Sequence, residues 1–295
     1  MVVVNLLETV IDLDAIATNT WILKNLVQPA QLMCVVKADG YNHGAIPVAR
    51  TVLANGADQL GVATLAEALE LREAGITAPI LCWIWSPEQD FAAALDANIH
   101  LAVVSMAHAQ AIVKYAAGKP EKLVQTTIKI DTGLHRSGVD ESQWEAVFTL
   151  LKDAGTATGN IEVTGVMSHL ACADEPGNPA NDTQAAAFNR AIALGRKLGL
   201  ELPVNHLSNS PAVLTRPDFY HDMVRPGLAV YGYSPLADGN DYGLQPAMSW
   251  VGKVTVVKPI EPGEGTSYNL TWRAAKPGYL AVIPAGYADG LPRRA

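Results

Sequence analysis

VVKADGYNHG, residues Val35–Gly44, has a lysine at the end of an apolar run, followed within a few residues by glycine, tyrosine, histidine and a second glycine. Taken alone, Lys37 is most simply a lysine that reaches into solvent from the end of a strand. The functional alternative is a lysine whose amine bonds covalently to a carbonyl compound. Such a site needs several of these side chains together, so the fold around the stretch decides between the two.

From this stretch to about residue 230, short β-rich runs alternate with helical patterns. Several runs are almost continuously apolar, as expected for strands buried on both faces. The predicted strands are 31–36, 58–63, 79–85, 99–105, 122–130, 161–170, 203–208 and 221–226. The predicted helices are 46–56, 64–75, 86–98, 106–118, 142–155, 182–199, 210–215 and 227–232. Eight βα units predict an α/β fold of the (β/α)₈ TIM-barrel type. A doubly wound sheet is the alternative, but no G-x-G-x-x-G follows the first strand.

The pattern changes after residue 235. A turn-rich segment is followed by runs at 248–260, 265–272 and 278–288 that alternate like antiparallel strands. We therefore predict a barrel domain over residues 1–235 and an incomplete, mainly antiparallel β domain over 236–295. Residues 1–12 contain a strand-like run that is a candidate to pair with the β domain. A helix at 14–27 follows, with Asp14 as its expected N-cap.

Composition excludes several classes of protein. The chain has 295 residues, is 49% hydrophobic and carries a net charge of −8. An acidic chain argues against a nucleic-acid surface or an anionic membrane as the partner. The three cysteines fit no zinc motif and no disulfide framework, so we expect no metal site and a reducing compartment. The amino terminus has no signal-peptide pattern and no apolar run approaches a membrane span, so we expect a cytoplasmic protein.

Polar residues gather where the predicted strands end, which is where barrels carry their reactive groups. They are Lys37, Lys129, Asp131, Arg136, His169, Asn209, Ser210 and Arg225. Singly, each has an ordinary interpretation, such as a solvated turn for the residues around Arg136. The loops after the last two strands, with helix starts at Ser210 and at Gly227–Leu228, are also where barrels bind phosphate. Simple N-capping by Ser210 is the alternative, and the two are compatible.

These residues lie in motifs that, taken in order, resemble the alanine racemase family. The motifs are VVKADGYNHG, IKIDTGLHRSG, SHLACADE, LSNSPA, VRPGLAVYG, GTSYNLTW and IPAGYADG. The resemblance implies a pyridoxal 5′-phosphate enzyme with a barrel and a C-terminal β domain that interconverts L-alanine and D-alanine and supplies D-alanine for peptidoglycan. It also implies that family members continue beyond residue 295, so we interpret the sequence as truncated.

The resemblance assigns a role to each matching position. Lys37 would bind the cofactor covalently and act as the base for D-alanine, and Tyr268 would be the opposite base for L-alanine. In the family this tyrosine comes from the second subunit of a homodimer. Arg225 would bond the pyridine nitrogen, and Arg136 the substrate carboxylate. Lys129 would orient Arg136, and His169 would link Arg225 to Tyr268. The remaining cofactor contacts would be Tyr41, Asn209, Ser210, Gly227 and Leu228.

Three other functions are weighed against this one. A cofactor-carrying barrel without turnover would lack the β domain and Tyr268. A decarboxylase of the same fold would be expected to have a carboxylate, rather than Arg225, at the pyridine nitrogen. A broader racemase acting on serine or lysine stays open, because selectivity for the side chain depends partly on the missing segment.

Overall fold

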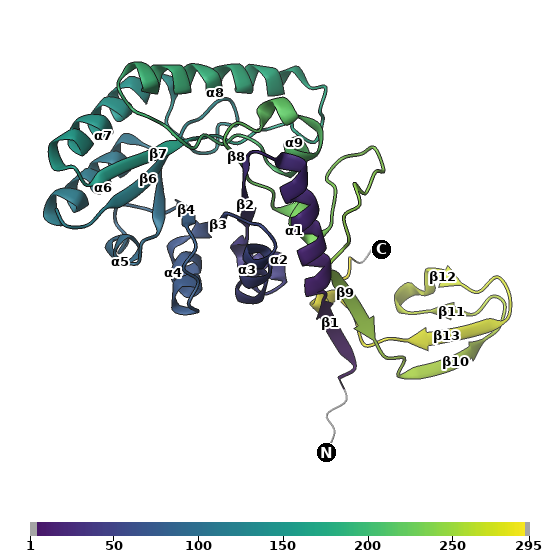
Figure 1. The fold of residues 1–295 in the computed structure, drawn as a ribbon. Helices are drawn as coiled ribbons and strands as arrows, with labels where there is room; N and C mark the ends of the chain where they lie inside the picture. The colour runs from purple at the N-terminus through teal and green to yellow at the C-terminus, as the bar shows by residue number, and fades with distance from the viewer. Residues whose placement is uncertain (1–4, 293–295) are drawn as a thin grey trace. The chain divides into compact units, whose positions relative to one another are not determined.

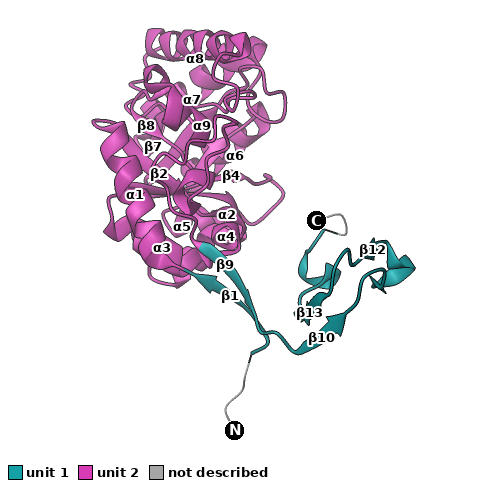
Figure 2. Cartoon of the chain, turned by 90° about the vertical axis from the view of Figure 1, so that its right-hand side faces the viewer, with its two compact units in different colours: residues 1–11, 248–295 teal, residues 12–247 magenta. Residues whose placement is uncertain are grey.

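The computed structural model describes residues 5–292 (Figure 1). The chain divides into two compact units, coloured separately in Figure 2. The larger unit is Asp12–Ala247, and the smaller one combines the chain up to Ile11 with the chain from Met248 onward. The segment 236–247 is tied to the larger unit by the buried side chain of Asn19. Its Nδ2 donates to the carbonyl of Gln245, and its Oδ1 accepts from the amide of Gln245.

The larger unit is built on a curled parallel sheet of seven strands in the order β7-β6-β5-β4-β3-β2-β8. The strands are β2 (Gln31–Val35), β3 (Gln59–Thr64), β4 (Ile80–Ile84), β5 (His100–Val103), β6 (Val124–Lys129), β7 (Ile161–Met167) and β8 (Met223–Val224). Their order follows the chain except at β8, which pairs with β2 and brings the last strand back to the first. The predicted α/β barrel class is confirmed.

The sheet closes through residues 203–208, the seventh predicted strand, which is not a regular strand here. On one side His206 N donates to Val166 O, and on the other Asp222 N donates to Asn205 O. The buried side chain of Asn205 also enters this ladder, because its Oδ1 accepts from Val166 N and its Nδ2 donates to Asp222 Oδ2 at 2.9 Å. A side chain acting as a backbone partner interrupts regular strand geometry, leaving an isolated bridge between Met167 and His206.

Most helices of this unit cover the outer side of the sheet (Figure 1). The helices are α1 (Leu13–Val27), α2 (Lys37–Asn42), α3 (Ala45–Ala54), α4 (Leu65–Glu73), α5 (Ala92–Asp96), α6 (Met106–Gly118), α7 (Trp144–Thr158), α8 (Pro179–Lys197) and α9 (Ser210–Thr215). Short 3₁₀ turns complete the unit: η1 (Glu141–Gln143), η2 (Pro217–Phe219) and η3 (Leu228–Tyr231). Within residues 5–292, none of the helices has the length and apolar character required to cross a bilayer.

Three local predictions are corrected. The N-cap of α1 is Asp12 rather than Asp14, because Asp12 Oδ1 accepts from the amides of Asp14 and Ala15. The helix predicted at 86–98 shrinks to α5, because residues 86–89 close a turn of their own. The helix predicted at 227–232 is the short turn η3.

The interior of the barrel is filled by side chains from successive strands. Met33, Leu81, Ala102, Met167 and Met223 form a buried apolar cluster. This packed layer of side chains fills the centre of the barrel, which is therefore not a pore. Polar chemistry is therefore left to the loops at its ends.

The smaller unit consists of paired antiparallel strands. The pairs are β1 (Leu7–Ile11) with β9 (Met248–Gly252), β10 (Val256–Ile260) with β13 (Gly278–Val282), and β11 (Gly265–Thr266) with β12 (Trp272–Arg273). Turns η4 (Tyr268–Leu270) and η5 (Tyr287–Asp289) follow β11 and β13. The β1–β9 pair is the one suggested for residues 1–12, of which residues 1–4 lie outside the described part. Many large apolar side chains of this unit are exposed, among them Trp272 and Val257.

Barrel closure predicts a strong effect of adding one methyl group at Gly165 in β7. A Cβ there would lie 1.8 Å from the carbonyl oxygen of Val204, a backbone atom that cannot rotate away. Overpacking of this kind costs on the order of 2 kcal/mol or more. We expect G165A to lower the free energy of unfolding by that amount in denaturant titrations. The control is G177A, where nothing lies within 4 Å of the added atom; equal stability of the two variants would contradict the closure.

Candidate active site

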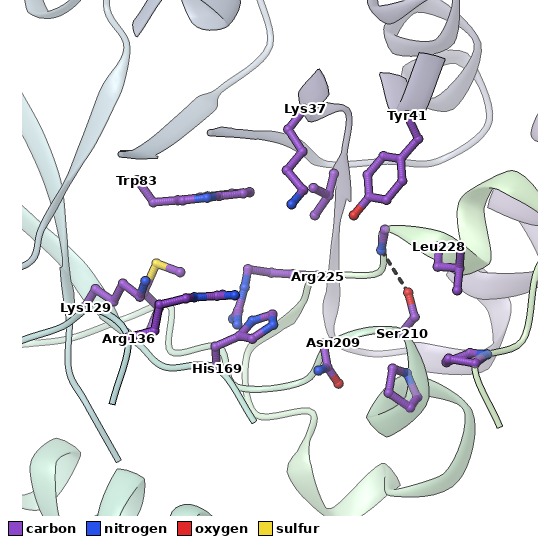
Figure 3. A pocket seen from close by; sticks show the side chains of 15 residues that line it. Lys37, Tyr41, Trp83, Lys129, Arg136, His169, Asn209, Ser210, Arg225 and Leu228 are labelled. Carbon is purple, nitrogen blue, oxygen red and sulfur yellow. Dashed lines mark hydrogen bonds between the residues drawn. The ribbon is translucent and has the colours of Figure 1, made fainter. Parts of the chain in front are cut away.

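A cavity of about 240 Å³ opens at the carboxyl ends of the barrel strands (Figure 3). Of the candidate residues from the sequence, Asp131 and Tyr268 do not line it. The others do: Lys37, Tyr41, Lys129, Arg136, His169, Asn209, Ser210, Arg225, Gly227 and Leu228. Residues far apart in the sequence meet here because parallel strands end at one edge of the sheet. Tyr268 belongs to the smaller unit, in η4, where its side chain is 82% exposed.

The segment α2, which begins at Lys37, is a left-handed turn and not a right-handed α-helix. Ala38, Asp39, Gly40 and Tyr41 have φ between 51° and 59°, and Asn42 has φ of 63°. Only Gly40 adopts this conformation freely, while other residues lose roughly 1–2 kcal/mol each. Sequence reasoning did not predict this turn. It directs Lys37 and Tyr41 into the same cavity, with Lys37 Nζ 5.6 Å from the centre of the Tyr41 ring.

Side chains of the turn and its flank stabilise this conformation. Asp39 Oδ1 accepts from the amide of Ala45 at 2.7 Å, which fixes the start of α3. His43 Nδ1 donates to the carbonyls of Gly40 and Tyr41, at 3.1 and 2.8 Å. The ring of His43 packs on Tyr231, which packs in turn on Tyr41. The tyrosine is thus held at the cavity wall.

One end of the cavity is formed by two helix starts and a hydroxyl. Ser210 Oγ, nearly buried, accepts from the amides of Gly227 and Ala229 at 2.9 and 3.2 Å. Within residues 5–292 no acceptor is recorded for the amides of Ser210 and Leu228, which begin α9 and η3. Free amides at helix starts favour an anion such as phosphate.

Gly227 has no room for a side chain. A Cβ there would lie 2.5 Å from the hydroxyl oxygen of Tyr41, which lies across the same helix start. The close approach keeps the backbone of Gly227 and the phenol of Tyr41 on one side of the cavity. This end of the cavity, the anion seat, consists of Tyr41, Ser210, Gly227 and Leu228.

Arg225 is buried beneath the cavity, and both terminal nitrogens of its guanidinium are hydrogen-bonded. It donates to His206 Nδ1 at 2.9 Å and to the carbonyls of His206, Leu207 and Ser168. Burial lowers the pKa of Arg225 to about 9, so it stays charged at neutral pH. No hydrogen bond joins Arg225 to His169 in the described part of the chain, so the link expected between them stays a prediction.

The other cationic groups concentrate positive charge around the cavity. Burial, helped by Arg136 and Arg225, lowers the pKa of Lys129 to about 8. Burial also lowers the pKa of His169 to about 3, again with Arg225 and Arg136 contributing. His169 is therefore a neutral imidazole at pH 7. A cluster of strongly shifted groups in a cleft is typical of a functional site.

Arg136 is presented by a tightly closed loop after β6. Asp131 Oδ1 accepts from the amides of Gly133 and His135, and the amide of Val139 donates back to Lys129 O. A buried chain from Thr132 to Ser168 and Gln184 ties this loop to the one that carries His169. The two loops are therefore positioned together.

Sequence reasoning missed several residues that line the cavity: Val35, Trp83, Met167, Pro211 and Pro235. Trp83, from β4, is the largest of them and forms one wall (Figure 3). Its ring fits because Gly61 on β3 has no Cβ; one would lie 2.7 Å from the indole. A tryptophan in an apolar strand is equally expected in a core, so the sequence held no signal for it.

The depressed pKa of His169 predicts acid sensitivity. The unfolded state binds a proton on this histidine near pH 6.5, whereas the folded state binds it only near pH 3. The free energy of unfolding therefore falls as the pH is lowered through this window, by up to about 1.4 kcal/mol per pH unit. In H169N we expect a shallower fall in denaturant titrations between pH 6.5 and 3, reduced rather than abolished because burial also lowers the pKa of His206.

The control for this experiment is H135N, at a site whose side chain is 82% exposed. Asparagine tolerates the positive φ of 55° found there. An unchanged slope in H169N would contradict the assignment of a neutral His169.

Comparisons with known proteins agree along almost the whole chain. Residues 11–235 match the family model described as alanine racemase, N-terminal domain, and residues 247–295 match that of the C-terminal domain. Alanine racemase of Corynebacterium efficiens is 63% identical, over 99% of this chain and 77% of its own length. Alanine racemase of Streptomyces lavendulae superposes with a TM-score of 0.93 at 40% identity, over 99% of this chain and 76% of its own.

A third relative is the solved alanine racemase of Bartonella henselae, described with covalently bound pyridoxal phosphate. Its TM-score is 0.85 at 27% identity, over 99% of this chain and 78% of its own. Both the sequence matches and the superpositions span the barrel and the smaller unit. The chain belongs to the alanine racemase family.

Proposed function

We propose that this protein is an isomerase that interconverts L-alanine and D-alanine, with pyridoxal 5′-phosphate bound covalently to Lys37. The observation that carries the proposal is the meeting of one lysine amine, the anion seat and a buried arginine in a single cavity. The covalently bound pyridoxal phosphate described for the Bartonella henselae relative supports the choice of cofactor.

The donor groups suit this cofactor. Its phosphate would accept from the free amides of Ser210 and Leu228 at the anion seat, beside the Tyr41 hydroxyl. Arg225 is buried and charged, and would donate to the pyridine nitrogen. Asn209, which caps α9, lies beside the seat. When bound, pyridoxal phosphate withdraws electrons from the α-carbon of the amino acid and so acidifies its α-proton.

The residues of the chain would supply the rest of the reaction. Racemisation needs a proton taken from one face of the α-carbon and returned on the other, so two bases must flank it. Lys37 Nζ would hold the proton on the face of D-alanine. Tyr268 of the partner subunit would hold it on the face of L-alanine.

The substrate carboxylate would pair with Arg136, which Lys129 orients. His169, neutral at pH 7, can accept a hydrogen bond and so take part in a chain between Arg225 and the phenol of Tyr268. Burial and the surrounding cations lower the pKa of His169. The residue would therefore act as a neutral hydrogen-bonding partner and not as a charged group.

A homodimer is part of the proposal. The 82% exposure of Tyr268 leaves its phenol available to another molecule. The many exposed apolar side chains of the smaller unit are also consistent with a protein partner. A shared site would make turnover depend on protein concentration.

The comparisons favour alanine over the other functions considered. The Corynebacterium relatives that are 63% and 60% identical to the chain are named alanine racemase, and each family model covers a domain of that enzyme. A cofactor carrier, a decarboxylase and a racemase of broader substrate range are therefore not favoured.

Exchange of the α-proton tests the proposal directly. With pyridoxal phosphate in heavy water, the protein is expected to incorporate deuterium into both L-alanine and D-alanine and to interconvert them. Each enantiomer is followed by NMR. K37A is expected to lose the exchange of both by at least 10²-fold, because it removes the covalent attachment of the cofactor together with one base. Cofactor binding without exchange of either enantiomer would support a carrier instead.

Removing the phenolic hydroxyl of Tyr268 distinguishes proton exchange on one face of the α-carbon from exchange on the other. In Y268F, interconversion is expected to fall at least 10²-fold in both directions, because it needs both bases. Wash-out of the α-proton of D-alanine should survive, because Lys37 alone can remove and return it, whereas wash-out from L-alanine should be lost. The control is Y279F, a 79% exposed tyrosine of the same unit. Equal loss of both wash-outs in Y268F would contradict the two-base assignment.

A further inference from the structure

Both backbone neighbours of Lys37 are anchored to the next βα unit. The amide of Val36 donates to the carbonyl of Gly61 in β3 at 2.9 Å. The amide of Ala38 donates to Glu67 Oε1, on the first turn of α4, at 2.8 Å. Lys37 therefore lies between one backbone anchor and one carboxylate anchor.

The two carboxylate oxygens of Glu67 accept hydrogen bonds from two different segments of the backbone. Oε2 accepts from the amides of Ala63 and Thr64 at 2.8 and 3.0 Å, completing a capping box with the Thr64 hydroxyl at the start of α4. Oε1 is turned the other way, toward Ala38. The helix cap uses only one oxygen, so the bond to Ala38 is additional to it.

The bond is made where the chain most needs support. Ala38 is the first left-handed residue of the turn, and its φ of 52° is unfavourable for an alanine. The rest of the turn is held by His43, which donates to the carbonyls of Gly40 and Tyr41, and by Asp39, which accepts from the amide of Ala45. Among the recorded bonds of the described residues, Glu67 is the side chain that holds the turn at its entry, directly after Lys37.

We propose that Glu67 is a positioning residue that fixes the direction in which the Lys37 amine enters the cavity. The inference rests on the proposed function, in which this amine binds the cofactor. With the Ala38 amide anchored, the lysine is pre-organised for attack on an aldehyde. Without the anchor, Ala38 would relax toward negative φ, and the Lys37 amine would no longer point into the cavity. The carboxylate acts through the backbone and touches neither cofactor nor substrate.

The test compares E67A with T64A. Each variant loses one half of the capping box: E67A loses the bonds to Oε2, and T64A loses the bond to the Thr64 hydroxyl. T64A keeps the carboxylate and its bond to Ala38. Hydrogen exchange of the peptide that contains Ala38 is measured by mass spectrometry on protein freed of cofactor. Capture of pyridoxal phosphate by Lys37 is then timed with borohydride quenching. We expect exchange about tenfold faster and capture about tenfold slower in E67A than in T64A, as for the loss of a charged hydrogen bond.

E70A is the control for the loss of a carboxylate from the same helix, at an exposed position. If E67A does not fold, E67M replaces it, because methionine keeps a side chain of similar length but has no oxygen to accept from Ala38. The proposal is overturned if E67A, or E67M in its place, matches T64A in both measurements. Failure of the wild-type protein to capture the cofactor at Lys37 would instead overturn the proposed function, while exchange at Ala38 would still report on the anchor.

Discussion

The hydrogen bonds that close the sheet are the interaction on which the site depends. Residues 203–208 bond to β7 on one side and to the chain entering β8 on the other. Asn205 and Asp222 reinforce this closure with buried side-chain bonds. Without it, the loops that carry His169, Ser210 and Arg225 would have no fixed position relative to Lys37, which follows β2. The close packing at Gly165 shows that no space for an added methyl group exists between β7 and residues 203–208.

Closure brings the groups together, and local backbone geometry then aims them. A left-handed turn points Lys37 and Tyr41 inward at a conformational cost, and the surrounding side chains offset that cost. Opposite the turn, the absence of a side chain at Gly227 lets the phenol reach the start of η3. Arg136 and Arg225 contribute to lowering the pKa of Lys129 and of His169, and such concentrated positive charge suits a site that receives an anion. Strain and like charge at one place are typical of function rather than stability.

Much of this could be predicted from the sequence, because strand ends can be located from patterns alone. Lys37, His169, Asn209 and Arg225 were found in that way, and all of them line the cavity. The left-handed turn could not be found, because Ala38 and Tyr41 carry no signal for a positive φ. The role of Glu67 could not be found from the sequence either, because its bond to Ala38 depends on the pairing of β2 with β3. For the same reason, the part of Asn205 in the ladder appears only when both neighbouring strands are in position.

The central claim is that one lysine among many is selected by this geometry to bind an aldehyde cofactor. The most direct measurement is to add one equivalent of pyridoxal phosphate, reduce with borohydride and map the modified peptides by mass spectrometry. The account predicts a single adduct on Lys37. Adducts spread over exposed lysines such as Lys114, with none at Lys37, would contradict it.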